Sequence, residues 1–282
     1  MRYAVDGVTL NVETHGSGPP LVLLHGFTGS AETWREPARC WGDAFTTIAV
    51  DLIGHGRSDA PADPARYRME RCVADLVALF DQLGLDRPAV LGYSLGGRVA
   101  LHLALAAPER VERLILESAS PGLADPKERA ARIRADESLA DAIERDGLEA
   151  FVARWEKLPL FASQERLPRE TREGLRRQRL RNTPRGLANS LRGMGAGAME
   201  PVFPRLGELR MPVLLVVGEL DAKYCVLGRS MAAVIPNAQL AIVQDAGHTV
   251  HLEQPRMFED LVRRLLAGPA PGARIAQGAP GV

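Results

Sequence analysis

One serine stands between two glycines where a strand-like run meets a helical pattern, and this junction constrains the fold more than any other segment. The sequence there is Ala89-Val90-Leu91-Gly92-Tyr93-Ser94-Leu95-Gly96-Gly97-Arg98, and a helical pattern covers residues 98–107. So tight a turn strains the serine backbone, and the glycines keep Cβ atoms out of the way. The hydroxyl is thereby directed clear of the sheet, beside the positive end of a helix. The segment therefore predicts a nucleophile at Ser94.

Strand-like runs alternate with helical patterns along much of the remaining chain. Residues 2–14 alternate about Asp6-Gly7 and predict an antiparallel hairpin. Continuous apolar runs predict strands buried on both faces, and apolar residues at helical spacing predict helices. The strand runs are 20–24, 46–51, 89–91, 111–116, 211–218 and 238–243, and the helical patterns are 69–83, 98–107 and 255–266. This order predicts an α/β fold with a mostly parallel sheet and helices on both faces.

Residues 121–205 differ in composition from the segments on either side. Charged helix formers replace the strand-like runs, so we expect an all-helical insertion that covers Ser94 as a lid. The core is then divided into residues 1–120 and 206–267, and we expect the Ala-, Gly- and Pro-rich tail 268–282 to be disordered. Most lid arginines are expected on solvated helix surfaces, but their density favours a positive ceiling that attracts anions. Those between 166 and 192, where the only acidic residues are Glu170 and Glu173, are Arg166, Arg169, Arg172, Arg176, Arg177, Arg179, Arg181, Arg185 and Arg192.

An aspartate and a histidine follow Ser94 in the chain order that accompanies this kind of turn. Asp221 and His248 come directly after predicted strands, at the sheet edge where Ser94 emerges and where open α/β sheets bind ligands. In this arrangement His248 is the general base that acts on the Ser94 hydroxyl, and Asp221 fixes the histidine tautomer. The backbone N–H groups of Leu95 and Phe27 are predicted to form an oxyanion hole.

Other residues compete for two of these roles. Glu219 and Asp245 are alternative acids, less well placed than Asp221. His251 lies three residues beyond His248 and is an alternative base. The glycine directly before His248 favours a sharp turn that presents its ring, so we expect Asp221 and His248 to be the pair that serves Ser94.

Arg98 distinguishes among the reactions that a base-activated serine supports, which include ester hydrolysis, C–C bond hydrolysis and direct proton abstraction. It lies four residues after Ser94, so the two share one face of a helix. A guanidinium at this place suits a carboxylate, which it can bind in bidentate geometry. The alternative is a structural ion pair on the helix, and we favour ligand binding.

Composition limits the remaining classes of function. The 282 residues include 35 basic and 35 acidic side chains, so no overall field attracts nucleic acid or a membrane surface. The chain starts without a signal-peptide core, and no apolar run approaches the ~18 residues of a membrane span, so we expect a cytoplasmic protein. The three cysteines lack metal-ligand spacing, and no phosphate loop or dinucleotide motif implies a cofactor. Oligomeric state stays open between a monomer and a small homo-oligomer.

Residues 1–267 resemble the α/β-hydrolase superfamily, and within it the 2-succinyl-6-hydroxy-2,4-cyclohexadiene-1-carboxylate synthases of menaquinone biosynthesis. The closer resemblance rests mainly on Arg98, the lid and Asp221-Ala222-Lys223. The segments that carry it are Gly92-Tyr93-Ser94-Leu95-Gly96-Gly97-Arg98, Pro121-Gly122-Leu123 leading to Arg129 and Arg132, Trp155, Pro159-Leu160-Phe161-Ala162-Ser163, Arg179 before Asn182, Gly218-Glu219-Leu220-Asp221-Ala222-Lys223, and Ala246-Gly247-His248-Thr249-Val250-His251-Leu252-Glu253. The resemblance implies an α/β-hydrolase fold with a helical lid insertion.

The resemblance also implies a lyase. Such an enzyme acts on a succinyl-substituted cyclohexene that carries an enolpyruvyl group and several carboxylates; it removes a proton and eliminates pyruvate. The expected partner is therefore a small anionic substrate, with no cofactor and no metal. The residues implied to bind it are Arg98, Arg132 and Arg179 at the carboxylates, Tyr93 and Trp155 along the pocket, and Lys223 as added charge beside Asp221.

Two other functions remain open at this point. One is a serine ester or C–C bond hydrolase that acts on a small carboxylate-bearing substrate, such as the hydrolases of aromatic ring-cleavage products, which share the triad and the lid. The other is a non-catalytic binding protein with the same fold. The presence of all three triad residues disfavours the second.

Overall fold

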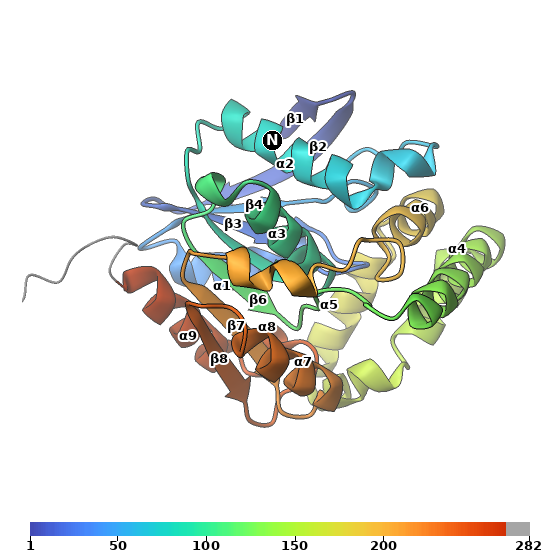
Figure 1. The fold of residues 1–282 in the computed structure, drawn as a ribbon. Coiled ribbons are helices and arrows are strands. Elements are labelled where there is room, and N and C mark those ends of the chain that lie inside the picture. The colour runs from blue at the N-terminus through green and yellow to red at the C-terminus, as the bar shows by residue number, and fades with distance from the viewer. Residues whose placement is uncertain (269–282) are drawn as a thin grey trace, which may run out of the picture.

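An eight-stranded sheet lies at the centre of the computed structural model, which describes residues 1–268 (Figure 1). The strand order is β1-β2-β4-β3-β5-β6-β7-β8; β1 pairs with β2 and β2 with β4 in antiparallel fashion, and the other pairings are parallel. The predicted α/β fold with a mostly parallel sheet is confirmed. The disorder expected of the tail concerns residues 269–282, which lie outside the described residues. The strands are β1 (Arg2–Val5), β2 (Val8–His15), β3 (Pro20–Leu24), β4 (Thr46–Val50), β5 (Ala89–Tyr93), β6 (Leu114–Glu117), β7 (Val213–Gly218) and β8 (Ala238–Val243).

Alternating side chains of the central strands contribute to two separate apolar layers. In β3, Val22 and Leu24 belong to one layer and Leu21 and Leu23 to the other, and all four are fully buried. Burying one such side chain contributes about 1.5–3 kcal/mol, so a strand covered on both faces is apolar throughout. The first layer is covered by α2 (Met69–Gln82), α3 (Leu95–Ala106) and α7 (Ala222–Ala232), and the second by α1 (Arg35–Trp41) and α9 (Pro255–Ala267).

Helix α3 begins earlier than its sequence pattern predicts. It starts at Leu95, directly after Ser94, rather than at Arg98. The low helix propensity of glycine conceals this start, since Gly96 and its successor occupy the first turn. Tertiary packing requires glycine there, because a Cβ on Gly96 would lie 2.2 Å from the Leu24 carbonyl oxygen. The helix N-terminus therefore directly adjoins the serine.

Between β6 and β7 the described chain forms helices and no strand. Helices α4, α5 and α6 of this segment gather on one side of the molecule (Figure 1), where α4 and α6 enclose a small apolar cluster that includes Ile143, Phe151 and Leu187. None of the helices in residues 1–268 is long and apolar enough to cross a membrane. The helices of this segment are α4 (Pro126–Trp155, kinked at Gly147), η4 (Pro159–Arg166), α5 (Arg169–Arg179), α6 (Pro184–Met194) and η5 (Phe203–Glu208).

Two buried histidines connect the loops that follow β3 and β4. The Nδ1 of His25 lies 2.8 Å from the Gly26 carbonyl, and its Nε2 accepts the Leu52 N–H at 3.0 Å, so the ring is neutral with its proton on Nδ1. His55 lies against it, with 5.0 Å between the ring centroids. Burial lowers the pKa of His25 to about 4 and that of His55 to about 3. Two neutral rings thus support the loop that presents Phe27.

We expect His25 to make the fold sensitive to acid. Its pKa is about 4 in the folded state, below the ~6.5 of an unfolded chain, so the unfolded state binds the proton more readily. Its contribution is complete above pH ~6.5 and is lost as the pH falls toward 4, by about 3 kcal/mol. Glutamine keeps a donor and an acceptor without titrating. Urea unfolding of His25→Gln should therefore show a smaller loss of unfolding free energy between pH 6.5 and 4 than the wild type. Equal losses would contradict this assignment.

Candidate active site

Ser94 occupies a strained turn between β5 and α3. Its φ of 51° and ψ of −105° are a combination that L residues rarely adopt. The flanking glycines permit it, because a Cβ on Gly92 would lie 2.2 Å from the Gly96 carbonyl oxygen. The Ser94 amide donates to the Glu117 carbonyl at the end of β6, at 2.9 Å. The side chain therefore projects beyond the carboxyl edge of the sheet.

The structure brings Asp221 and His248 to this hydroxyl. Asp221 follows the end of β7, and His248 follows the end of β8. His248 Nε2 lies 3.1 Å from Ser94 Oγ, and His248 Nδ1 lies 2.7 Å from Asp221 Oδ2. Because Nδ1–H donates to the buried carboxylate, Nε2 is left as an acceptor directed at the serine. Such an arrangement allows a histidine to take the proton of the hydroxyl.

The competing acids and histidine lie elsewhere. Glu219 and Asp245 are exposed. His251 forms a second acid–histidine pair behind Tyr93, in which its Nδ1 lies 2.8 Å from Glu117 Oε2 and both side chains are fully buried. The His251 ring meets the Tyr93 ring edge to face, with 5.0 Å between centroids. This second pair supports the residue before Ser94 and makes no contact with the serine hydroxyl.

The two backbone amides predicted to form the oxyanion hole belong to the same cavity wall as Ser94. Leu95 is the first residue of α3, and Phe27 lies in the loop after β3. Within residues 1–268, neither amide donates to a carbonyl in a loop or turn hydrogen bond. A free amide at a helix N-terminus is a favourable partner for developing negative charge. The position of both residues is consistent with the predicted role.

A cavity of about 250 Å³ opens beside Ser94. Arg98, Arg132 and Lys223 line it, whereas no aspartate or glutamate of the described residues does. Arg98 comes from α3 of the core and Arg132 from α4 of the helical segment, so two distant parts of the chain converge here. The aromatic residues of the wall are Phe27, Tyr93, Trp155, Phe161 and Tyr224. The cavity is therefore apolar in its walls and cationic in its charge.

Arg98 has no carboxylate partner in the described part of the chain. Its guanidinium contacts the Met199 Sδ atom at 3.9 Å, whereas Arg132 Nε lies 2.8 Å from Asp136 Oδ1. Burial lowers the pKa of Arg98 to about 10, and the charge of Arg132 acts in the same direction. The half-buried group still carries its charge at neutral pH, and a partly desolvated charge without a counter-charge is unfavourable. An anionic ligand would supply the partner.

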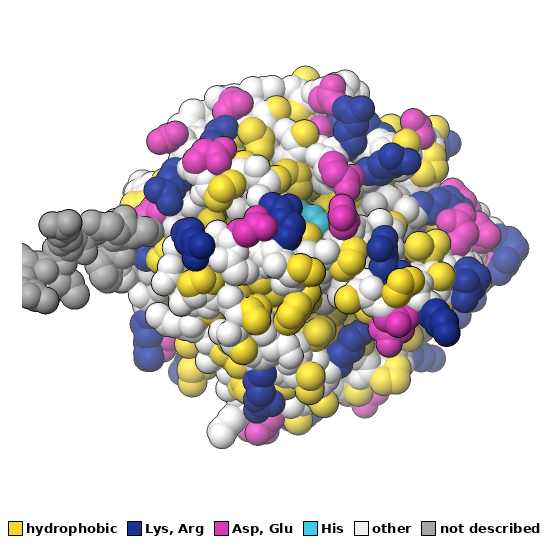
Figure 2. Space-filling model, in the orientation of Figure 1, with side chains coloured by type: hydrophobic (Ala, Val, Ile, Leu, Met, Phe, Trp, Pro, Cys, Tyr) yellow, Lys and Arg dark blue, Asp and Glu magenta, His cyan; other side chains and the backbone are white. Residues whose placement is uncertain are grey.

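The expected positively charged lid surface above Ser94 is largely absent. Carboxylates from other helices, distant in sequence, neutralise several of the arginines between residues 166 and 192. Basic and acidic side chains accordingly lie side by side on the face shown in Figure 2. The sequence conceals these partners because they approach only in the fold. The pairs with distant carboxylates are Arg166–Glu253, Arg176–Glu149 and Glu156, Arg179–Glu156, Arg181–Glu32, and Arg192–Glu137, Asp141 and Glu144; Arg169 pairs with Glu173 of its own helix.

Arg179 lines a different cavity from Ser94, contrary to the expectation that it joins Arg98 and Arg132. A second cavity of about 780 Å³ adjoins the first and shares Phe27, Tyr93 and Phe161 with it. The Arg179 guanidinium lies over the Phe161 ring, 5.4 Å from its centroid. The reason is the placement of α5: its Gln178 donates to Ser30 Oγ and to Thr33 Oγ1, each at 2.9 Å, which holds the helix over the loop after β3.

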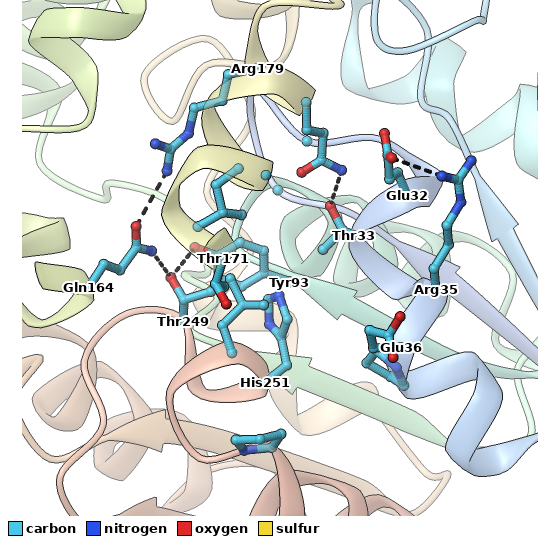
Figure 3. Close-up of a pocket in the computed structure, with 18 of the residues that line it drawn as sticks. Glu32, Thr33, Arg35, Glu36, Tyr93, Gln164, Thr171, Arg179, Thr249 and His251 are labelled. Atoms are coloured by element: carbon cyan, nitrogen blue, oxygen red, sulfur yellow. Dashed lines mark hydrogen bonds and ion pairs between the residues drawn. The ribbon is translucent and has the colours of Figure 1, made fainter. Parts of the chain in front are cut away.

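Sequence reasoning missed three polar residues near the site. Tyr224 stands 4.7 Å from the His248 ring, between centroids, and lines the Ser94 cavity. Gln164 and Thr249 are hydrogen-bonded to each other at 2.7 Å beside Tyr93 (Figure 3). The positions of Tyr224 and Thr249, close in sequence to Asp221 and His248, could have indicated them. Gln164 has no such signal, since only the fold of the helical segment places it there.

Comparison with known proteins gives one consistent result. Residues 19–255 match the family model described as alpha/beta hydrolase fold. The putative 2-succinyl-6-hydroxy-2,4-cyclohexadiene-1-carboxylate synthase of Bacillus subtilis is 47% identical over 93% of this chain and 96% of its own. The synthase of that name from Serratia proteamaculans is 33% identical over 89% and 94%. The solved structure of MenH from S. aureus superposes with a TM-score of 0.87 at 34% identity, covering 90% of this chain and 97% of that one. The chain belongs to the α/β-hydrolase fold family and, within it, to the group of the 2-succinyl-6-hydroxy-2,4-cyclohexadiene-1-carboxylate synthases.

Proposed function

We propose that this protein is a lyase of menaquinone biosynthesis. It converts 2-succinyl-5-enolpyruvyl-6-hydroxy-3-cyclohexene-1-carboxylate into 2-succinyl-6-hydroxy-2,4-cyclohexadiene-1-carboxylate and pyruvate. The observation that carries the proposal is the half-buried Arg98, which has no carboxylate partner, in a cavity lined by cations and by no carboxylate of the described residues. A substrate with three carboxylates supplies the missing counter-charges. The names of the relatives, which share up to 47% identity in the comparisons above, support the same reaction.

In the proposed mechanism, Ser94, His248 and Asp221 form a base. The proton that leaves is on ring carbon 2, next to the succinyl ketone. His248 Nε2, 3.1 Å from Ser94 Oγ, takes the hydroxyl proton as Oγ takes the proton from ring carbon 2, and Asp221 stabilises the imidazolium that forms. As the C2–H bond breaks, its electron pair forms a double bond to carbon 3, the existing double bond shifts to carbons 4 and 5, and the C5–O bond breaks. Enolpyruvate departs with that electron pair and takes up a proton to become pyruvate.

Other residues of the cavity stabilise or bind the negative charges of the substrate. The amides of Leu95 and Phe27 stabilise the enolate oxygen of the succinyl ketone as the proton leaves. Arg98 and Arg132 bind carboxylates from two sides of the cavity, and Lys223 adds positive charge at its rim. Tyr93 and Trp155 contribute to the wall. Arg179 remains a candidate for binding a carboxylate, from the adjoining cavity behind Phe161.

The Ser94–His248 geometry also fits an ester or C–C bond hydrolase, so the two reactions must be measured side by side. One assay follows pyruvate released from the succinyl-cyclohexene intermediate generated in situ, and the other follows hydrolysis of a short nitrophenyl ester. We expect rapid pyruvate release with negligible ester hydrolysis. Efficient ester hydrolysis without pyruvate release above background would assign the protein to the hydrolases.

Removal of the Ser94 hydroxyl should abolish the lyase activity. Ser94→Ala leaves His248 without the group it deprotonates, and the effect of losing an activated serine is about 10³-fold or more in kcat. Thermal unfolding of the variant checks that the fold persists. Pyruvate release by Ser94→Ala at a rate close to wild type would show that the serine is not part of the base.

Arg98→Gln should raise KM for the tricarboxylate and lower kcat/KM by about 10- to 100-fold, since a charge-assisted hydrogen bond is worth about 1.5–3 kcal/mol. Arg169→Gln is the matched control, because Arg169 is 85% exposed and paired with Glu173. The control should lie within twofold of wild type in steady-state kinetics. An Arg98→Gln enzyme with unchanged kcat/KM would contradict the assigned carboxylate contact.

A further inference from the structure

Four buried side chains form one continuous hydrogen-bonded chain along the wall of the larger cavity, and it ends at Tyr93, which lines both cavities. Figure 3 shows it running from Arg179 in α5, through Gln164 in η4 and Thr249 after β8, to Tyr93 at the end of β5. The distances are 3.4 Å from Arg179 Nη2 to Gln164 Oε1, 2.7 Å from Gln164 Nε2 to Thr249 Oγ1, and 3.1 Å from Thr249 Oγ1 to Tyr93 Oη. All four side chains are at most 9% exposed. We call these four residues the buried relay.

The direction of the buried relay is fixed by chemistry. A guanidinium can only donate, so the Gln164 atom facing Arg179 is its oxygen, and its nitrogen faces Thr249. The Thr249 oxygen therefore receives a hydrogen from Gln164. The hydrogen of the Thr249 hydroxyl then has one acceptor among the described residues, the Tyr93 oxygen. In the opposite direction the Thr249 hydrogen would have no acceptor among the described residues, whereas in the assigned direction the Tyr93 hydrogen can reach a ligand acceptor in either of the two cavities that Tyr93 lines.

This direction leaves the Tyr93 hydroxyl proton without a partner in the buried relay. Because the Tyr93 oxygen accepts from Thr249, its own O–H stays free to donate to an acceptor in the cavities that Tyr93 lines. Burial raises the pKa of Tyr93, so the phenol keeps its proton and remains a donor. Tyr93 directly precedes Ser94, and Thr249 directly follows His248. The buried relay thus links the helical segment to both residues of the Ser–His pair.

We propose that Gln164 and Thr249 are positioning residues: they set the direction of the Tyr93 hydroxyl so that its proton is presented to an oxygen of the substrate. This inference rests on the proposed lyase function for the identity of that oxygen, a carbonyl or carboxylate oxygen of the tricarboxylate. Gln164 and Thr249 touch no reacting atom. They act through Tyr93, and Arg179 acts by fixing the orientation of the Gln164 amide.

The experiment is a double-mutant cycle measured by pyruvate release. Thr249→Val removes the hydroxyl at nearly constant volume, and Tyr93→Phe removes the donor on which it acts. We expect Thr249→Val to lower kcat about tenfold, the scale of one hydrogen bond, with a smaller change in KM. In the Tyr93→Phe background the same substitution should have little further effect. Thr249→Ser should restore kcat, which excludes a fault in folding. Additive effects would show that Thr249 has only a structural role and would overturn the inference.

Gln164→Glu tests the donor–acceptor direction of the hydrogen bonds in the buried relay, because it keeps the connection between Arg179 and Thr249. The carboxylate still binds Arg179 and still reaches Thr249, but it can only accept, so Thr249 donates to it and Tyr93 must donate to Thr249. We expect kcat to fall at least as far as in Gln164→Met, which breaks the connection. Glu165→Ala, an exposed neighbour in η4, is the control and should match wild type. A Gln164→Glu enzyme with wild-type kcat would overturn the assignment of direction.

These outcomes are separable from the failure of the proposed function. A wild-type protein that releases no pyruvate refutes the lyase proposal by itself. The same cycle is then measured on the ester that the wild type hydrolyses, since Tyr93 adjoins Ser94 in either reaction. Non-additive effects of the Thr249 and Tyr93 substitutions support the inference, and additive effects overturn it, whichever of the two reactions is measured.

Discussion

The close approach of backbone at Gly92 and Gly96 is the constraint on which the remaining structure depends. A Cβ at Gly92 would lie 2.2 Å from the carbonyl oxygen of Gly96, and one at Gly96 would lie at the same distance from that of Leu24. Only this contact allows β5 to turn into α3 within one residue and places Ser94 at the N-terminus of the helix. The two amides proposed to form the oxyanion hole, the histidine and the cationic cavity are all arranged around that position. The strain stored in the turn is therefore a condition of the site.

Charge is used in two distinct ways in this molecule. Most arginines of the helical segment are paired with carboxylates near the surface, where such pairs are worth at most ~1 kcal/mol. Arg98 is the contrasting case, because it is half-buried in the cavity beside Ser94 and its guanidinium has only a thioether as a hydrogen-bond partner among the described residues. The number of arginines in a segment thus indicates little about ligand binding. A more telling sign of an anion site is a partly desolvated guanidinium that lines a cavity and lacks a carboxylate partner.

The helical segment does more than cover the cavity. Gln164 and Arg179 connect it to Thr249 and Tyr93, the immediate neighbours of His248 and Ser94. A displacement of η4 would therefore act, through these hydrogen bonds, on the residues next to Ser94 and His248. This connection offers a physical route by which the conformation of the covering helices is coupled to the orientation of groups at the reacting centre.

The sequence by itself determined the α/β fold, the serine turn, the order of Ser94, Asp221 and His248, and the importance of Arg98. These features depend on local chemistry: apolar runs define buried strands, glycines permit a strained turn, and residues at strand ends share one edge of a sheet. Tertiary structure alone decided which arginines are paired, that Arg179 lies behind Phe161, and that Gln164 reaches Thr249. Among those contacts, the pair Arg181–Glu32 joins residues 149 positions apart. No periodicity of the sequence reports them, because they depend on how α5 and η4 lie on the core rather than on which helices form.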